Sequence, residues 1–126
     1  MEESGIQILN QDNLISTIKT CYEKPFYRVL IVVRKYVMSV EVGSFVIDNI
    51  NTLYPYEHSE FKIKSDTVQF PNGSLIKIIN QGSTAKAYRV HKILLSDMSD
   101  LELINVLNPM VRDYEEEQRW RKETSF

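Results

Sequence analysis

Two short apolar runs in the chain predict buried strands. Residues 27–33 (YRVLIVV) and 92–96 (KILLS) are almost continuous in aliphatic and β-branched side chains. A strand that is covered on both faces has this pattern, because neither set of alternate positions meets water. The two runs therefore predict strands near the centre of a sheet.

Apolar positions with a spacing of three or four residues predict helices on either side of the first strand. The first helix covers residues 10–23, with Asn10 or Asp12 available to cap it, and ends before Pro25. The second covers residues 37–54 and ends before Pro55. Its predicted apolar stripe consists of Met38, Val42, Phe45, Val46, Ile50, Leu53 and Tyr54.

The segment after the second helix predicts a β-hairpin. Residues 66–70 and 74–79 alternate between apolar and polar side chains around the turn Pro71-Asn72-Gly73. An Asn-Gly pair between such segments favours a tight turn, because both residues tolerate positive φ. Residues 61–64 form a further short strand candidate, and the polar residues 80–87 predict a loop.

The last third of the chain predicts one or two helices. Ser99 and Glu102 form a capping-box pattern ahead of an apolar stripe that begins at Leu103. Asn108-Pro109 interrupts this stripe, which indicates either a kink or the capped start of a second helix. Two glutamate–arginine pairs at i,i+4 spacing predict a solvated helical end, namely Glu115 with Arg119 and Glu117 with Arg121.

This order of elements predicts an α/β fold. We expect a mixed sheet with a central parallel pair, formed by strands 27–33 and 92–96, which are adjacent or separated by one strand. A β-hairpin extends or flanks an edge, and helices pack on the faces. The predicted core includes Val29, Ile31, Val33, Phe45, Ile50, Leu94 and Leu107.

Composition predicts the number of domains and excludes several kinds of protein. With 126 residues, 43% hydrophobic and 25% charged, the chain predicts a single domain over residues 1–126. The single cysteine, Cys21, excludes an internal disulfide and is expected to be buried and structural. With His58 and His91 it makes no zinc spacing, so we expect no metal and no cofactor. No signal peptide or membrane helix is recognisable, which predicts a cytoplasmic protein.

Charge is unevenly distributed along the chain. Residues 61–92 carry six Lys or Arg against one acidic residue, whereas the flanking segments are both acidic. Two interpretations are open for this middle segment. It is either a solvated hairpin surface or a phosphate-facing patch. The candidate binding residues of such a patch are Lys62, Lys64, Lys77, Lys86 and Arg89.

Catalytic motifs are missing where they would be expected. None of the four glycines precedes a lysine, so no phosphate-binding loop of the G-x-x-x-x-G-K type is present. Asp97 ends the second buried strand, a position where many nucleotide hydrolases hold magnesium. Met98 stands where a glutamate would polarise the attacking water. Asp97 is therefore a metal ligand, a residue at a helix start or an exposed turn residue.

Several segments together resemble the ATPase core of phage large terminases. These are YRVLIVVRKYVMS, the helix ending in LYP, TVQFPNGSLIKIIN, and RVHKILLSDMSDLELINVLNPMV, over about residues 27–111. The resemblance implies that Asp97 matches the Walker B aspartate and that Met98 replaces the family's glutamate. The family's phosphate loop and its C-terminal nuclease domain have no counterpart here.

The resemblance implies a phage-encoded, catalytically inactive interaction module. It would dock on a protein complex, either the packaging motor or a host enzyme, in the cytoplasm of the host cell. Two alternatives are a nucleic-acid-binding accessory protein and a DNA-packaging ATPase subunit that a partner chain completes. We expect a protein partner, possible contact with nucleic acid, and no membrane.

Overall fold

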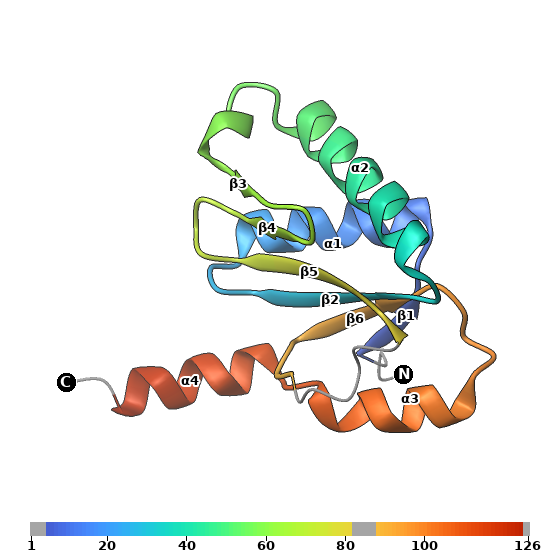
Figure 1. Cartoon of the computed structure of the whole chain (residues 1–126). Helices are drawn as coiled ribbons and strands as arrows, with labels where there is room; N and C mark the ends of the chain where they lie inside the picture. The colour runs from blue at the N-terminus through green and yellow to red at the C-terminus, as the bar shows by residue number, and fades with distance from the viewer. Residues whose placement is uncertain (1–4, 82–87, 125–126) are drawn as a thin grey trace.

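The computed structural model describes residues 5–81 and 88–124 and has an α/β fold (Figure 1). Six strands form one mixed sheet in the order β1-β6-β2-β5-β4-β3. The strands are β1 (Ile6–Ile8), β2 (Arg28–Val33), β3 (Lys62–Ile63), β4 (Thr67–Gln69), β5 (Leu75–Asn80) and β6 (Lys92–Leu95). The helices are α1 (Gln11–Glu23), α2 (Tyr36–Leu53), α3 (Leu101–Leu107) and α4 (Tyr114–Thr124), with short 3₁₀ turns at His58–Glu60 and Asn108–Met110.

The predicted central parallel pair is confirmed. Strand β2 lies directly beside β6, with Ile31 opposite Leu94, and pairs in parallel with β5 on its other side. All but the first residue of β2 are buried. Helices α1 and α2 cover one face of the sheet, while α3 covers part of the other (Figure 1). This two-sided burial explains why the β2 sequence is apolar throughout.

The predicted hairpin is also confirmed. Strands β4 and β5 pair antiparallel, with Val68 opposite Ile76. Gly73 has a φ of 89°, and the turn closes through its N–H, which donates to the carbonyl of Phe70 at 3.0 Å. The Asn-Gly pattern was thus sufficient to locate this turn.

One predicted core residue is wrong. Phe45 is 37% exposed, whereas the other six predicted core residues are buried. The buried line of α2 runs through Val46 and Ile50, four residues apart. Phe45 lies one residue, or about 100° of helix rotation, away from this line, so its side chain lies at the margin of the buried face.

The start of α3 and the break after it also differ from the prediction. The helix is capped by Asp100, whose Oδ1 accepts the N–H of Leu103 at 3.1 Å, rather than by Ser99. A carboxylate at the N-cap accepts a hydrogen bond from a first-turn N–H, and its negative charge interacts favourably with the positive end of the helix dipole. Asn108-Pro109 begins a separate 3₁₀ turn, and α4 starts afresh at Tyr114.

Strand β1 was not predicted. It has three residues and pairs in parallel with β6, with Ile6 opposite Ile93. Three residues are too few to show a period of two, so this strand depends on the edge that β6 offers it. The strand expected over residues 61–64 is shorter, covering Lys62–Ile63.

Candidate functional site

Half of one sheet face is left uncovered by the described helices. The described elements that cover this face are α3 and the 3₁₀ turn after it, whose apolar side chains pack on β1, β6, β2 and the end of β5, and α4, which reaches Arg28 at the start of β2. One helix is about 10 Å wide and neighbouring strands lie about 4.8 Å apart, so a single helix covers two or three strands. The same side of β3, β4 and the first half of β5 remains open (Figure 1).

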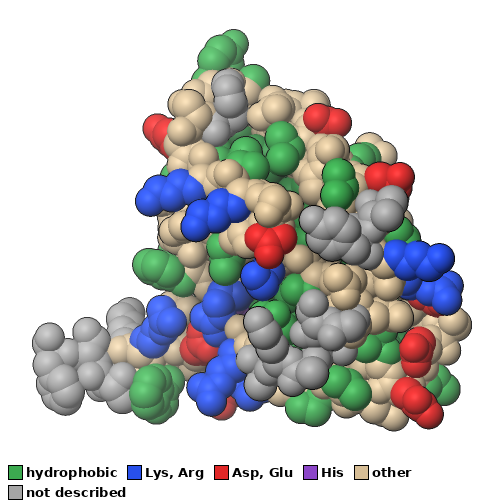
Figure 2. Space-filling view, viewed as in Figure 1, with side chains coloured by type: hydrophobic (Ala, Val, Ile, Leu, Met, Phe, Trp, Pro, Cys, Tyr) green, Lys and Arg blue, Asp and Glu red, His purple; other side chains and the backbone are tan. Residues whose placement is uncertain are grey.

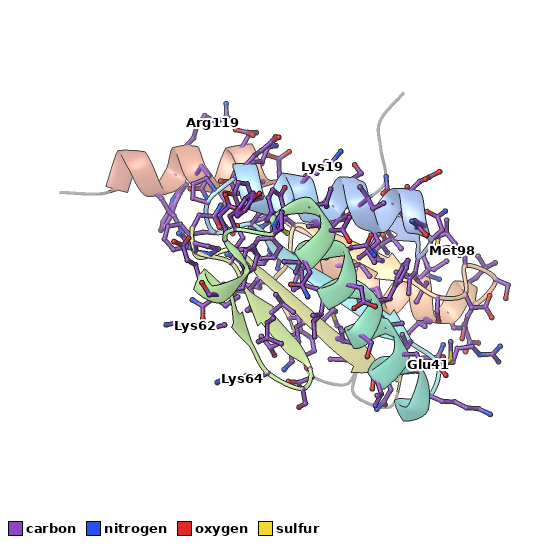
Figure 3. The ribbon with its side chains drawn as sticks, turned by 90° about the horizontal axis from the view of Figure 1, so that it is seen from above. Lys19, Glu41, Lys62, Lys64, Met98 and Arg119 are labelled. Carbon is purple, nitrogen blue, oxygen red and sulfur yellow. The ribbon has the colours of Figure 1, made fainter. Side chains whose placement is uncertain are left out.

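Three of the predicted lysines lie on this open half. Lys62 is opposite Gln69, which is opposite Leu75, and in the next row Thr67 is opposite Lys77. Residues that are directly opposite in a sheet point to the same face. The alternate residues Val68, Ile76 and Ile78 are buried under α1 and α2, so the lysine row faces the other way. Figure 3 shows Lys62 and Lys64 pointing out of one side of the molecule, away from Lys19 and Arg119.

We call the surface formed by Lys62, Lys64 and Lys77 the basic face. Lys62 and Lys64 are exposed, and the Lys77 side chain is 33% exposed. Asp66 is the single acidic residue of segment 61–92, and it pairs with Lys77 at 3.4 Å. Figure 2 shows Lys and Arg side chains over the left and centre of this view and again at its right edge, with Asp and Glu side chains among them.

The two other predicted cations are placed differently. Arg89 is exposed shortly before β6, and its backbone carbonyl accepts the side-chain Nε–H of Arg28 at 2.7 Å. Arg89 therefore lies beside the strand that borders β5. Lys86 lies outside the described residues.

Asp97 lies at the carboxyl end of β6 and has the geometry of a turn residue. Its Oδ1 accepts the N–H of Ser99 at 2.9 Å and the Ser99 hydroxyl at 2.6 Å. Its other oxygen is 3.4 Å from the guanidinium of Arg34, at the end of β2. The hydrogen bonds from Ser99 hold the pKa of Asp97 below its usual value. This geometry favours the turn interpretation over that of a metal ligand.

Metal-ligating groups do not converge within the described ranges 5–81 and 88–124. These residues contain no group of three His, Cys, Asp or Glu side chains that could hold a metal ion. Met98, at the position that the resemblance assigns to a glutamate, is 37% exposed on the same connection as Asp97. Cys21 is fully buried, and burial raises the pKa of its thiol, as expected for a structural cysteine.

A polar cluster that was not predicted lies at the opposite end of β2. Both terminal nitrogens of Arg28 donate to Glu117 of α4, at 3.1 and 3.0 Å. His91 is enclosed beside them, with a side chain only 1% exposed. Its Nδ1 accepts the backbone N–H of Arg28 at 2.9 Å, and its Nε2 lies 3.2 Å from Glu117. Segments far apart in sequence thus share one hydrogen-bond network.

These contacts assign the protonation state of His91. An imidazole nitrogen that accepts a backbone N–H carries no proton, so the proton is on Nε2 and is donated to Glu117. Burial, together with the nearby Arg28 charge, lowers the pKa of His91. The Arg28 hydrogen bond holds the pKa of Glu117 below its usual value. His91 is therefore neutral, and because both ring nitrogens are engaged, it is not placed to act as a general base.

The same cluster anchors α4 on the body of the protein. The hydroxyl of Tyr114 donates to the carbonyl of Pro25 at 2.6 Å, and the Tyr114 ring lies edge-on to the His91 ring with centroids 5.1 Å apart. Lys24 pairs with Glu115 at 3.3 Å. The first turns of α4 are thus attached, while the rest projects away from the sheet (Figure 1). The interpretation of this segment as a wholly solvated end was wrong for Glu117.

Part of this cluster was accessible from the sequence. The predicted parallel pairing of strands 27–33 and 92–96 brings Arg28 close to His91. Nothing in the local pattern indicates that Glu117 folds back to meet them, because its expected partner was Arg121, four residues further along the helix.

Comparisons with known protein families, with curated protein sequences and with solved structures find no match to this chain. In the part of the chain that the structure describes, no helix is both long enough and apolar enough to cross a membrane. A functional assignment therefore depends on the geometry of the surfaces described above.

Proposed function

We propose that this protein is a non-catalytic binding module whose basic face contacts the phosphate backbone of nucleic acid. The observation that carries the proposal is the cross-strand register that places Lys62 and Lys77 on one face of the sheet, with Lys64 just beyond the end of β3, where its N–H donates to the carbonyl of Thr67. A solvated hairpin with one buried face would also carry its polar side chains on the other face, so the excess of charge there, three lysines against Asp66, is what favours a phosphate ligand. Arg89 adds a cation beside β6.

The dimensions of the face suit a short stretch of backbone. Lys64 lies two residues after Lys62, just past the end of β3, or about 6.6 Å away in extended chain, and β5 lies two strands away, or about 10 Å. Long lysine side chains cover such distances and meet neighbouring phosphates. Each neutralised phosphate contributes about −0.9 to the slope of log K against log salt on duplex DNA. Contacts by Lys62 and Lys64 therefore predict a slope of about −2, which becomes about −3 when phosphate also displaces Asp66 from Lys77.

No aromatic side chain is placed on the basic face by the described register. Recognition of base edges or stacking on aromatic rings is what gives sequence or single-strand preference. The proposed binding is therefore directed at the backbone and is independent of sequence.

Docking on a protein complex is the second candidate, and the observation that favours it is Trp120. This side chain is 64% exposed on the projecting helix α4. Exposed tryptophans are frequent anchors of protein interfaces. The resemblance to terminase ATPase cores is compatible with both candidates, since a phage-encoded packaging accessory could touch DNA, the packaging motor or a host enzyme. A packaging ATPase subunit completed by a partner chain has less support, because Asp97 is already engaged by Ser99 and Arg34.

The test uses two double variants with the same change in net charge. Lys62→Glu with Lys64→Glu alters the basic face, whereas Lys19→Glu with Arg119→Glu alters the opposite side of the molecule (Figure 3). Binding to a fluorescein-labelled 20-base-pair duplex is measured by anisotropy between 50 and 200 mM salt. Loss of two phosphate contacts lowers affinity at 0.1 M salt by roughly 60-fold, and the control pair changes it by only a few fold.

Three results would contradict the proposal. Equal losses in the two double variants would mean that the basic face is not the site. Binding that does not weaken with salt would exclude the phosphate backbone as the ligand. If the wild-type protein gave no anisotropy change even at 50 mM salt, docking on a protein partner would replace nucleic-acid binding as the preferred function.

A further inference from the structure

Arg28 belongs to the same row of the sheet as Lys62. Leu75 of β5 is opposite Arg28 of β2 and also opposite Gln69 of β4, which is opposite Lys62 of β3. The four side chains therefore share one face, with cations at both ends of the row. Unlike Lys62, however, Arg28 is paired, because Glu117 occupies both terminal nitrogens of its guanidinium.

The Arg28–Glu117 contact uses the donors that a phosphate would use. A guanidinium binds carboxylate and phosphate in the same forked geometry, with two parallel N–H donors directed at two oxygens. The Glu117 carboxylate and a backbone phosphate therefore cannot occupy the fork of Arg28 together. We propose that Glu117 is an internal substitute for phosphate, and that displacement of α4 by nucleic acid adds Arg28 to the basic face. This inference rests on the proposed function.

The ion pairs that attach α4 are of a kind that an anionic ligand can displace, and undocking of the helix also breaks the hydrogen bond from Tyr114 to the carbonyl of Pro25. The Arg28 and Glu117 side chains are 26% and 23% exposed, so their pairing is only partly shielded from water. The second ion pair, between Lys24 and Glu115, is 44% and 71% exposed and adds little. Helix α4 has 11 residues and is rich in charge, and a helix of this length is marginal without tertiary contacts.

The charged side chains around the Arg28 guanidinium favour binding of an anion there after α4 is displaced. Lys24 lies beside the Tyr27 and Tyr114 rings, and Arg89 lies on the segment whose carbonyl holds Arg28. Arg121, the other cation near His91, belongs to α4 and departs with it. Removal of Glu115 and Glu117 with the helix therefore leaves a more positive surface next to the basic face.

Thermodynamic linkage gives the proposal a measurable form. If phosphate and Glu117 compete for Arg28, nucleic acid binds the undocked form more tightly, and any change that weakens docking strengthens binding. Couplings of this kind commonly amount to about 5- to 150-fold in affinity. Arg28 also contributes about 0.9 to the salt slope of the wild-type protein, and Arg28→Gln should remove that contribution, because one phosphate contact is lost.

The experiment compares two neighbouring glutamates of α4. Glu117→Gln and Glu116→Gln remove the same charge from the same helix, but the exposed Glu116 side chain is not the one that meets Arg28. Anisotropy titration with the 20-base-pair duplex should show at least a fivefold tighter complex for Glu117→Gln than for Glu116→Gln. Adding Arg28→Gln to the Glu117→Gln variant should abolish the gain.

A second variant separates competition from net charge and from misfolding. Glu117→Asp keeps the charge but shortens the side chain by one methylene, so the fork is not reached and binding should tighten. Circular dichroism verifies that each variant is folded. The single tryptophan, Trp120, lies on α4, so its fluorescence emission should change when duplex binds to the wild-type protein and α4 leaves.

The outcomes distinguish this inference from the proposed function. Equal affinities of Glu117→Gln and Glu116→Gln would overturn the inference, while a selective loss in the Lys62→Glu, Lys64→Glu variant would still support the basic face. A gain that persists without Arg28 would also overturn it. If neither the wild-type protein nor any Glu117 variant bound duplex, both proposals would fail together.

Discussion

Replacement of His91 by leucine tests the hydrogen-bond network at its most enclosed point. The substitution leaves the Arg28 backbone N–H without its acceptor and removes one donor from Glu117. An unsatisfied buried donor costs about 1–3 kcal/mol, and a hydrogen bond to a charged group contributes about 1.5–3 kcal/mol. Glu117 keeps its two bonds from Arg28, so we expect the free energy of unfolding to fall by about 2–4 kcal/mol at pH 7.5.

His91→Asn is the matched control, because its side-chain oxygen can replace Nδ1 as an acceptor for the Arg28 N–H. We expect a loss of about half that of the leucine variant, because one of the two hydrogen bonds is restored. Urea unfolding followed by far-ultraviolet circular dichroism measures all three proteins. A leucine variant as stable as the wild type, or no more destabilised than the asparagine variant, would contradict the proposed role of Nδ1.

The pH dependence of the same comparison has a defined sign. The pKa of His91 is lower in the folded protein than its usual value of 6.5, so the unfolded chain takes up a proton first as pH falls. The neutral imidazole therefore stabilises the wild type fully above about pH 6.5, and this contribution is lost below it by up to about 1.4 kcal/mol per pH unit. His91→Leu lacks the group, so the difference between the two proteins should shrink between pH 7.5 and 5.5.

Two features keep this pH experiment specific. His58 is present in the wild type and in both variants, so its titration cancels in the differences. Glu117 has a folded pKa below its usual value of 4.5, so its contribution is lost only at lower pH than the window used. A difference in the free energy of unfolding that stays constant from pH 7.5 to 5.5 would show that His91 is not the titrating group.

Three further predictions concern the fold and the expected lack of catalysis. Gly73→Ala should lower the free energy of unfolding in urea by about 1–3 kcal/mol, because the φ of Gly73 is +89° and an alanine Cβ there would lie 2.5 Å from the Phe26 ring. Gly43→Ala is the control. The nearest atoms to its Cβ would lie at 3.8 Å, so this variant should be as stable as the wild type or more stable. Leu94→Ala should lower the free energy of unfolding by about 2–5 kcal/mol, since the Leu94 side chain is fully buried in the core beneath α1 and α2. A decrease below about 1 kcal/mol would contradict that packing. Calorimetric titration with Mg-ATP should detect no binding, since the chain lacks a phosphate loop, and micromolar affinity would refute the non-catalytic assignment.

The sequence by itself determined the elements that depend on local pattern. The continuous apolar runs predicted β2 and β6, because a strand buried on both faces cannot carry polar side chains at either set of alternate positions. The Asn72-Gly73 pair predicted the hairpin turn, because Gly73 accepts a positive φ that other residues resist. The candidate lysines were likewise visible as an excess of positive charge in one segment.

Tertiary structure decided which of these features act together. The lysines share a face because of the strand register, and among the described residues that face is open because α3 is a single helix of seven residues on a sheet of six strands. The hairpin turn also holds the end of α1, where Asn72 donates to the carbonyls of Cys21 and Tyr22. No local periodicity contains either fact, because each depends on where a distant element ends.

The network of Arg28, His91 and Glu117 shows this limit most clearly. Arg28 and Glu117 are 89 residues apart in sequence, and their pairing depends on α4 lying against Arg28 of β2 and against His91. The i,i+4 rule favoured Arg121 as the partner of Glu117 and could not include a guanidinium presented from another element. The partly buried, two-bonded pair of Arg28 and Glu117 is more favourable than a solvated Glu117–Arg121 pair on the helix surface. Arg28 comes close to Glu117 only in the folded protein.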